Sequence, residues 1–213
     1  LRIAGQDFGM ETRLLLAFQD GSLPRMDLAA NLDPSTFASA KKFWIMHKMP
    51  AATVKWLDDA LVEGQVLDGR ISIGGDLDDW PFRDHSGVFD ARATVRDATL
   101  KFHPDWPAGQ DMDIDLAFDG PGFTLAGTGE IQGTRVDTVS GGIPDFQAPL
   151  LALDIAASGS GAKLRELLIN SPINKDYGEH LKAARIDGRS DVAVQRALPL
   201  KAGLAGKRIE GTV

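Results

Sequence analysis

Side chains able to do chemistry are scattered along this 213-residue sequence and do not gather into a known motif. The four histidines are His47, His85, His103 and His180, and none has the His-x-x-x-His or His-Glu-x-x-His spacing that brings two imidazoles to one metal. The sequence has no Gly-x-Ser-x-Gly nucleophile motif and no cysteine, which excludes disulfides, thiolate nucleophiles and thiolate zinc sites. We therefore expect each histidine to be a surface or turn residue.

Acidic residues resemble a calcium loop only superficially. Asp111, Asp113 and Asp115 have the alternate spacing of its first ligands. An EF-hand also needs a glycine at the sixth position and a glutamate at the twelfth, where this sequence has Leu116 and Gly122. Because these aspartates alternate with apolar residues, a strand with one wet side explains them, and we predict no metal site.

Other candidate motifs fail on spacing or direction. The glycine-rich segments 127–133 and 159–163 have neither the dinucleotide fingerprint nor a complete phosphate loop. The carboxylate pairs Asp58-Asp59 and Asp78-Asp79 are sequence neighbours, so their side chains point in different directions and are expected to be solvated. We predict no catalytic residues, no cofactor and no enzymatic activity.

Composition narrows the class of protein further. Lysine and arginine total 23 against 30 aspartates and glutamates, a net charge of −7, which argues against nucleic-acid binding because that needs a basic surface. Hydrophobic residues make up 43% of the chain, enough to form a core. No apolar run approaches the about 20 residues of a membrane-spanning helix. Both ends have the pattern of strands, which favours a segment of a longer protein.

Alternation with a period of two residues is the dominant signal of the sequence. In 111–119, Met112, Ile114, Leu116 and Phe118 share one side of a strand and the aspartates share the other. Similar alternation recurs from residue 14 to residue 200, with glycine-rich turns between the runs. The apolar positions change parity within 87–102, which predicts a bulge or bend near Asp97.

Two places break the alternation and predict helices. In segment 35–63, residues 33–36 could cap a first helix around Trp44 that ends before Pro50. A second helix would open at Pro50, with apolar residues at helical spacing from Val54 to Leu61 and Gly64 placed to end it. A shorter helix is expected in 162–172. The predicted fold is mainly β: one curved antiparallel sheet over 1–213, either an open groove or sandwich-like, with two or three short helices packed on it.

Several short motifs follow one another within 43–118. They are KWLDDALVEGQV at 55–66, DGRISIGGDL at 68–77, WPFRD at 80–84, SGVF at 86–89, LKF at 100–102 and DWP at 105–107. A further motif, LRELLINSPI, follows at 164–173. The order of the motifs in 43–118 resembles the central region of YhdP-like proteins of the AsmA-like superfamily, and the motif at 164–173 resembles a second element of that family.

The resemblance implies a large, non-enzymatic protein of the Gram-negative envelope. Such a protein is expected to lie in the periplasm, tethered to the inner membrane by an anchor that this sequence does not contain, with possible envelope protein partners. Its curved sheet would carry phospholipid acyl chains between the inner and outer membranes on a concave apolar face.

From the alternation, we predict a set of groove-lining residues. An alternative function remains open: a structural or assembly module that binds a protein partner by strand addition at a sheet edge. A closed sandwich would show the same alternation as an open groove. The predicted lining residues are Ile71, Ile73, Phe89, Val95, Ile114, Leu116, Phe118, Phe123, Leu125, Leu153 and Ile155.

Overall fold

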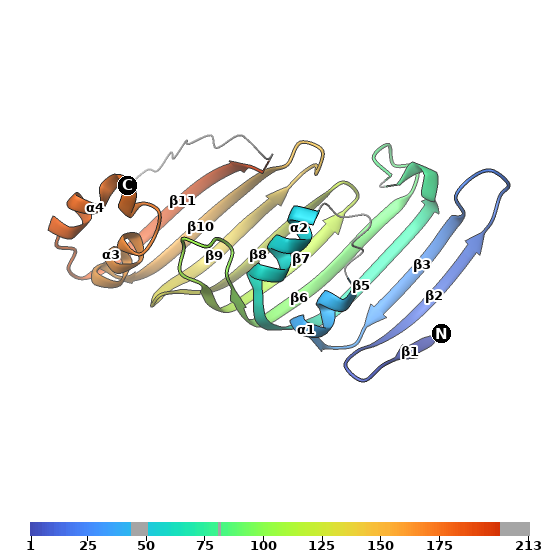
Figure 1. Cartoon of the computed structure of the whole chain (residues 1–213), viewed down its shortest axis with the longest axis horizontal. Helices are drawn as coiled ribbons and strands as arrows, with labels where there is room; N and C mark the ends of the chain where they lie inside the picture. The colour runs from blue at the N-terminus through green and yellow to red at the C-terminus, as the bar shows by residue number, and fades with distance from the viewer. Residues whose placement is uncertain (44–50, 81, 201–213) are drawn as a thin grey trace.

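The described residues form one open antiparallel sheet with short helices along one of its margins (Figure 1). The computed structural model describes residues 1–43, 51–80 and 82–200. Strand order follows the sequence, β1-β2-β3-β5-β6-β7-β8-β9-β10-β11, and β4 pairs with β5 beside β3. The strands are β1 (Arg2–Ala4), β2 (Gly9–Ala17), β3 (Arg25–Leu32), β4 (Ser35–Thr36), β5 (Leu61–Asp76), β6 (Val88–Leu100), β7 (Gly109–Asp119), β8 (Gly122–Ile131), β9 (Thr134–Ile143), β10 (Leu150–Ser160) and β11 (Arg189–Pro199).

The two faces of the sheet differ in chemistry because the side-chain period of every strand is two residues. We call the side that carries Leu28, Ile73, Leu116, Leu125 and Leu153 the apolar face. Cross-strand pairing keeps these residues on one side: Leu28 lies opposite Ile73, and Leu116 lies opposite Leu125. The opposite side, the polar face, carries arginines, aspartates and threonines.

A bulge keeps the register in phase across the middle of the sheet. The pairing of β6 with β7 shifts between Val95 and Ala98, and Asp97 between them has a φ of 51°. The extra residue restores the apolar side chains to one face, as the parity change predicted. The expectation of a bulge near Asp97 is therefore confirmed.

A single layer explains why the core is small. Phe37, Val95, Ala98, Met112 and Ile114 form one buried cluster. Over the ranges that the structure describes, no large side chain is fully buried, because no second sheet packs on the apolar face. Of the two arrangements that the alternation left open, the structure has the open sheet and excludes the sandwich.

The connections between strands alternate between the two margins of the sheet. The first rim is formed by the connections 18–24, 77–87, 120–121 and 144–149. The second rim is formed by 5–8, 33–60, 101–108, 132–133 and 161–188.

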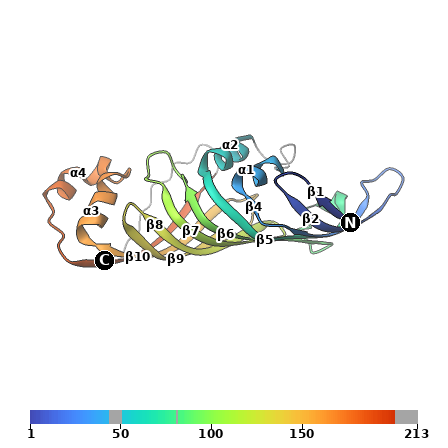
Figure 2. The ribbon, with the colours of Figure 1, turned by 90° about the horizontal axis from the view of Figure 1, so that it is seen from below.

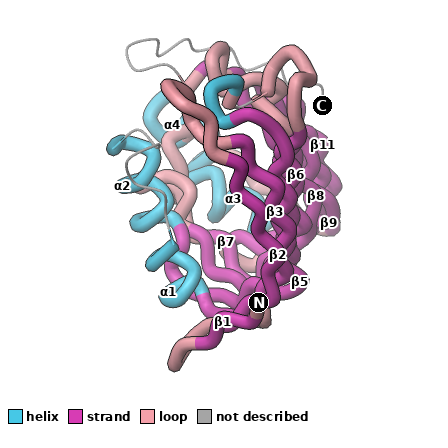
Figure 3. Tube along the Cα trace, turned by 90° about the vertical axis from the view of Figure 1, so that its right-hand side faces the viewer, coloured by secondary structure: helices cyan, strands magenta, loops and turns pink. Residues whose placement is uncertain are grey.

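The four α-helices of the described residues all belong to the second rim. They lie on one side of the sheet, and the sheet bends around that side (Figures 2 and 3). The helices are α1 (Phe37–Ala40), α2 (Ala51–Ala60), α3 (Gly161–Ile169) and α4 (Asn174–Ala183), with short 3-10 turns η1 (Lys41–Phe43) and η2 (Leu77–Asp79).

Helical segments differ in detail from the sequence prediction. Helix α2 ends at Ala60, earlier than expected, and Leu61 begins β5. Gly64 does not end a helix: it lies in β5, where the absence of a side chain makes room for the Phe37 ring, 3.0 Å from the position a Cβ would take. Helix α3 falls where a helix was predicted, whereas α4 was not predicted. In the described part of the predicted first helix, the structure has α1 and the 3-10 turn η1, and its remainder, residues 44–50, lies outside the described residues.

Candidate functional site

All eleven predicted lining residues lie on the apolar face. Register places them in rows that run across the strands: Ile73 opposite Phe89, Val95 opposite Ile114, and Phe118 opposite Phe123. Leu153 and Ile155 of β10 continue the face on the far side of β9. The structure therefore brings these residues together on one continuous surface, and the period of two residues was sufficient to find them.

The predicted residues beneath helix α1 are more deeply buried than the others. Val95 and Ile114 are 5% and 8% exposed because Phe37 of α1 packs on them. The other nine predicted lining residues are only partly buried. Of the predicted residues, the two beneath α1 are thus covered and the other nine are accessible in part, as an exposed binding surface would be.

Several apolar residues of the same face were missed by the prediction. None of them lies on a strand that carries a predicted residue, but the pairs on β3 and β11 recur every second residue, so that signal was present in the sequence. The pairs on β3 and β11 widen the surface toward the two sheet edges, and the pair on β9 fills it between β8 and β10: Met26 and Leu28 on β3, Val192 and Val194 on β11, and Val136 and Val139 on β9.

The helices and loops of the second rim are joined to one another by polar contacts. Trp56 of α2 donates its indole Nε1–H to the carbonyl of Phe102 at 3.1 Å. Lys175 of α4 lies 3.4 Å from the Asp105 carboxylate, which belongs to the connection 101–108 of the same rim. Arg165 of α3 donates to the carbonyls of Leu181 and Lys182 and so fixes α4 to α3. This margin of the apolar face is therefore bordered by connected elements.

The first rim folds aromatic rings onto the apolar face. Phe146 of the connection 144–149 stacks on Phe123 and Phe118, with ring centroids 5.9 Å and 6.5 Å apart. In the connection 77–87, the Trp80 ring lies 4.8 Å from that of Phe89. Phe82, 3% exposed, packs over Gly75 and Gly87. Of this cluster, only Phe89, Phe118 and Phe123 were predicted, because Trp80, Phe82 and Phe146 lie in loops without periodicity.

One ion pair joins two connections of the first rim. Arg83 Nη1 lies 2.5 Å from Asp145 Oδ1, although the two residues are 62 positions apart. We call this pair the rim tie. Asp145 also accepts a hydrogen bond from the backbone N–H of Gln147 at 2.8 Å. The hydrogen bond from Arg83, and then that from Gln147, hold the pKa of Asp145 below its ordinary value.

The rim tie should therefore persist under mildly acidic conditions. Because the folded-state pKa of Asp145 lies below that of the unfolded chain, its contribution to stability is present above the unfolded pKa. That contribution is lost as the pH falls through the folded pKa. We expect Arg83→Gln to raise the pKa of Asp145, measured by following its carboxyl carbon in a 13C NMR titration. Glu166, whose lowered pKa is due mainly to Lys163, is the internal control that should not move. An unchanged Asp145 midpoint in the variant would contradict the tie.

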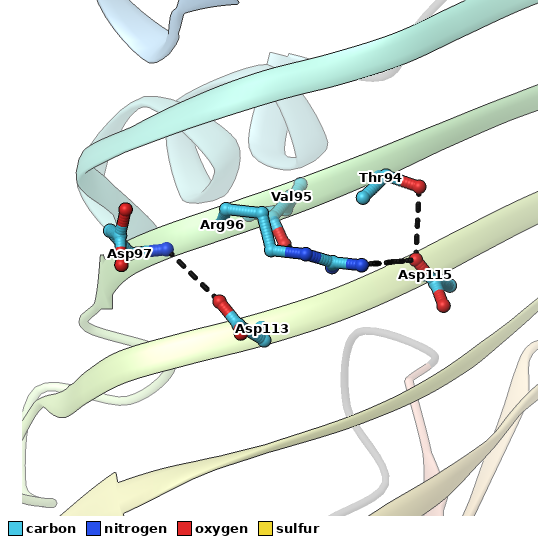
Figure 4. A network of polar contacts seen from close by, with 6 residues as sticks. All are labelled: Thr94, Val95, Arg96, Asp97, Asp113 and Asp115. Atoms are coloured by element: carbon cyan, nitrogen blue, oxygen red, sulfur yellow. Dashed lines mark hydrogen bonds and ion pairs between the residues drawn. The ribbon is translucent and has the colours of Figure 1, made fainter.

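The polar face is organised by carboxylates that do not form a metal site (Figure 4). Asp113 accepts the backbone N–H of Asp97 at the bulge, at 3.2 Å. Asp115 accepts from the Thr94 hydroxyl at 3.0 Å and from the Arg96 guanidinium at 3.4 Å. These aspartates thus satisfy donors of the neighbouring strand. In the described ranges, no three histidine, cysteine or acidic side chains converge as a metal would require.

The opposite side of the sheet offers an alternative candidate site. A shallow hollow on the polar side of β2, β3 and β5 is lined by Arg13, Arg70 and Ser72 among others, on the opposite side of the sheet from the candidate face. Among the described residues, no helix is long and apolar enough to cross a membrane. The apolar face bordered by the two rims is therefore the candidate functional site.

Comparisons with known proteins found a matching family model and a curated relative. The family model described as "YhdP protein" matches residues 1–213. A curated relative from Escherichia coli (strain K12), named "Intermembrane phospholipid transporter YhdP", is 24% identical over 191 residues. The match covers 89% of this chain but 15% of that relative. That relative is a transporter by name, in keeping with the prediction of a protein that is not an enzyme. No solved structure matches. The chain belongs to the YhdP family.

Proposed function

We propose that this chain is a segment of a phospholipid transport protein and that acyl chains move passively along its apolar face. One observation carries the proposal: an apolar surface continues from β2 to β11, and no second sheet of the described residues packs on it. The name of the Escherichia coli relative supplies the ligand class. Residues 1–213 would act together as one stretch of a longer groove.

The physical basis of binding would be the hydrophobic effect. Each methylene transferred from water to the apolar face contributes about 0.8 kcal/mol, so a long acyl chain needs only partial contact to stay bound. The contribution is nearly the same at every position along a uniform surface. A chain can therefore slide between positions of similar free energy, which suits passive movement. Phospholipid head groups would stay in water at the margins of the sheet.

Location and attachment follow from the same proposal. The segment would lie in the periplasm of a Gram-negative cell, between inner and outer membranes, and the complete protein would be tethered to the inner membrane. Envelope proteins at either membrane would be its partners. This proposal rests on the family and on the name of the relative.

Site-specific photo-cross-linking tests whether lipid contacts the apolar face. A benzophenone amino acid replaces Leu116 or Ile155 on the apolar face, and Thr124 or Ala152 on the polar face serves as the matched control. The purified chain is mixed with phosphatidylethanolamine and phosphatidylglycerol vesicles, irradiated and analysed by mass spectrometry. We expect lipid adducts at the first two positions only. Equal capture on both faces, or none on the apolar face, would reject the proposal.

A second candidate function rests on the edge strand β11. It pairs with β10 along eleven residues, from Arg189 to Pro199, and no described residue pairs with its other side. Such an edge can accept a strand from a protein partner. This alternative is favoured if a replacement of Val194 by proline abolishes the binding of a protein partner in cells while lipid capture by the apolar face stays intact.

A further inference from the structure

The strongest unexplained feature is an aromatic side chain that lies on the proposed acyl-chain surface. Phe118 and Phe123 are cross-strand partners on the apolar face. The Phe146 ring is nearly parallel to that of Phe123, at 11°, and the residue remains 44% exposed. Phe146 therefore occupies the place that a passing acyl chain would take over these two rings.

Phe146 is held there by its short connection. Its backbone N–H donates to the carbonyl of Pro121 at 2.9 Å, and its neighbour Asp145 belongs to the rim tie. Gly122 allows the connection to lie this close to β8, because a Cβ at Gly122 would come within 2.3 Å of the Pro144 carbonyl oxygen. The connection is thus attached by a few identifiable contacts and by the tie to Arg83.

The partner connection is the firmer of the two. Phe82, next to Arg83, is 3% exposed and is held at a φ of 60°, a backbone conformation that a bulky residue adopts only when its surroundings enforce it. His85 has a similar φ of 63°. Because Phe82 is locked over Gly75 and Gly87, Arg83 is a fixed anchor, and the connection 144–149 is the part that can move.

We propose that Phe118 and Phe123 form an acyl-chain subsite, that Phe146 plugs it, and that the rim tie sets how readily the plug leaves. This inference rests on the proposed function and adds a barrier within the groove. A ring stack with a partly exposed ion pair is worth about as much as burying two or three methylenes. A long acyl chain that contacts these rings can therefore displace Phe146, whereas a short chain cannot.

The first test compares chain binding with and without the plug. The probe is cis-parinaric acid, an 18-carbon polyene fatty acid whose fluorescence rises in apolar surroundings, titrated into the purified 213-residue chain. Phe146→Ala is expected to bind it about fivefold more tightly than the parent chain, because no ring must leave. Phe18→Ala, which removes a 78% exposed ring from the same rim, is the matched control and should leave the affinity unchanged.

The second test holds the plug in place without removing it. The chain has no cysteine, so Arg83→Cys with Asp145→Cys introduces the only two thiols. A short reducible bis-methanethiosulfonate cross-linker between them should weaken probe binding about fivefold, and reductant should restore it.

The outcomes separate this inference from the proposed function. Probe binding that Phe146→Ala leaves unchanged or weakens, or that the cross-link leaves unchanged, would overturn the plug. In that case, lipid capture at Leu116 and Ile155 would still support a lipid-carrying face. Failure of every variant to bind the probe, with no lipid adducts on the apolar face, would overturn both.

Discussion

Replacement of Ile155 by aspartate is expected to reduce acyl-chain binding about thirtyfold. Ile155 lies on the apolar face between Val139 of β9 and Val194 of β11, so the new carboxylate would stand in the path of a chain. The change removes contact with two or three methylenes and forces a passing chain to strip water from a charge, at a cost of about 2 kcal/mol. Ile155 is outside the buried cluster around Phe37, so the sheet should still form.

The matched control for this variant is Ala152→Asp on the same strand. Ala152 is exposed on the polar face, opposite Gly142 and Ala197, and gains the same charge without touching the apolar surface. Binding of a fluorescent phospholipid by the two purified variants, with circular dichroism to check folding, gives the comparison. Equal binding by Ile155→Asp and Ala152→Asp would rule out the apolar face as the path of the chain.

The largest loss of stability is expected from Phe37→Ala. Phe37 is 3% exposed and is the side chain through which α1 packs on Val95, Ala98 and Ile114. Truncation of a buried phenylalanine typically lowers the free energy of unfolding by about 3–5 kcal/mol, through lost transfer free energy and the cavity left behind. In a sheet without a second layer, few other contacts can compensate.

Urea unfolding followed by circular dichroism measures this effect. Phe18→Ala provides the comparison, because an exposed ring should change the free energy of unfolding by less than about 0.5 kcal/mol. A similarly small loss in Phe37→Ala would mean that α1 contributes little to the core. The same experiment tests whether the packing of the helical segment 35–63 on the sheet contributes to the stability of the fold.

The apolar face could be predicted from the sequence because it depends on a local rule. Once Ile114, Leu116 and Phe118 are assigned to a strand, the period of two residues places them together, and the turns place neighbouring strands beside them. Even the bulge at Asp97 left a parity change in the sequence. Resemblance to the family then supplied a ligand class that no residue pattern could give.

Features that depend on long-range contacts could not be predicted. Arg83 and Asp145 are 62 positions apart, and neither segment has a sequence pattern that indicates their contact. Phe146 lies in an irregular connection where no periodicity indicates which way its ring points. Helix α4 was missed because its sequence is mostly polar, with Gly178 in its interior, so it shows no apolar stripe. Alternation alone also cannot reveal whether a second layer exists.

The order of strands in the sheet has a consequence for how such a molecule forms. Apart from the short strand β4, each strand pairs with those that precede and follow it in the sequence, so the chain can add one hairpin at a time. Pairing between sequence neighbours keeps loop closure short, which favours rapid folding compared with β folds that join distant strands. Growth from one end also means that the length of the finished surface is set by the number of hairpins. A protein built this way can gain or lose a hairpin in evolution and change its reach without altering the pairing of the strands that remain.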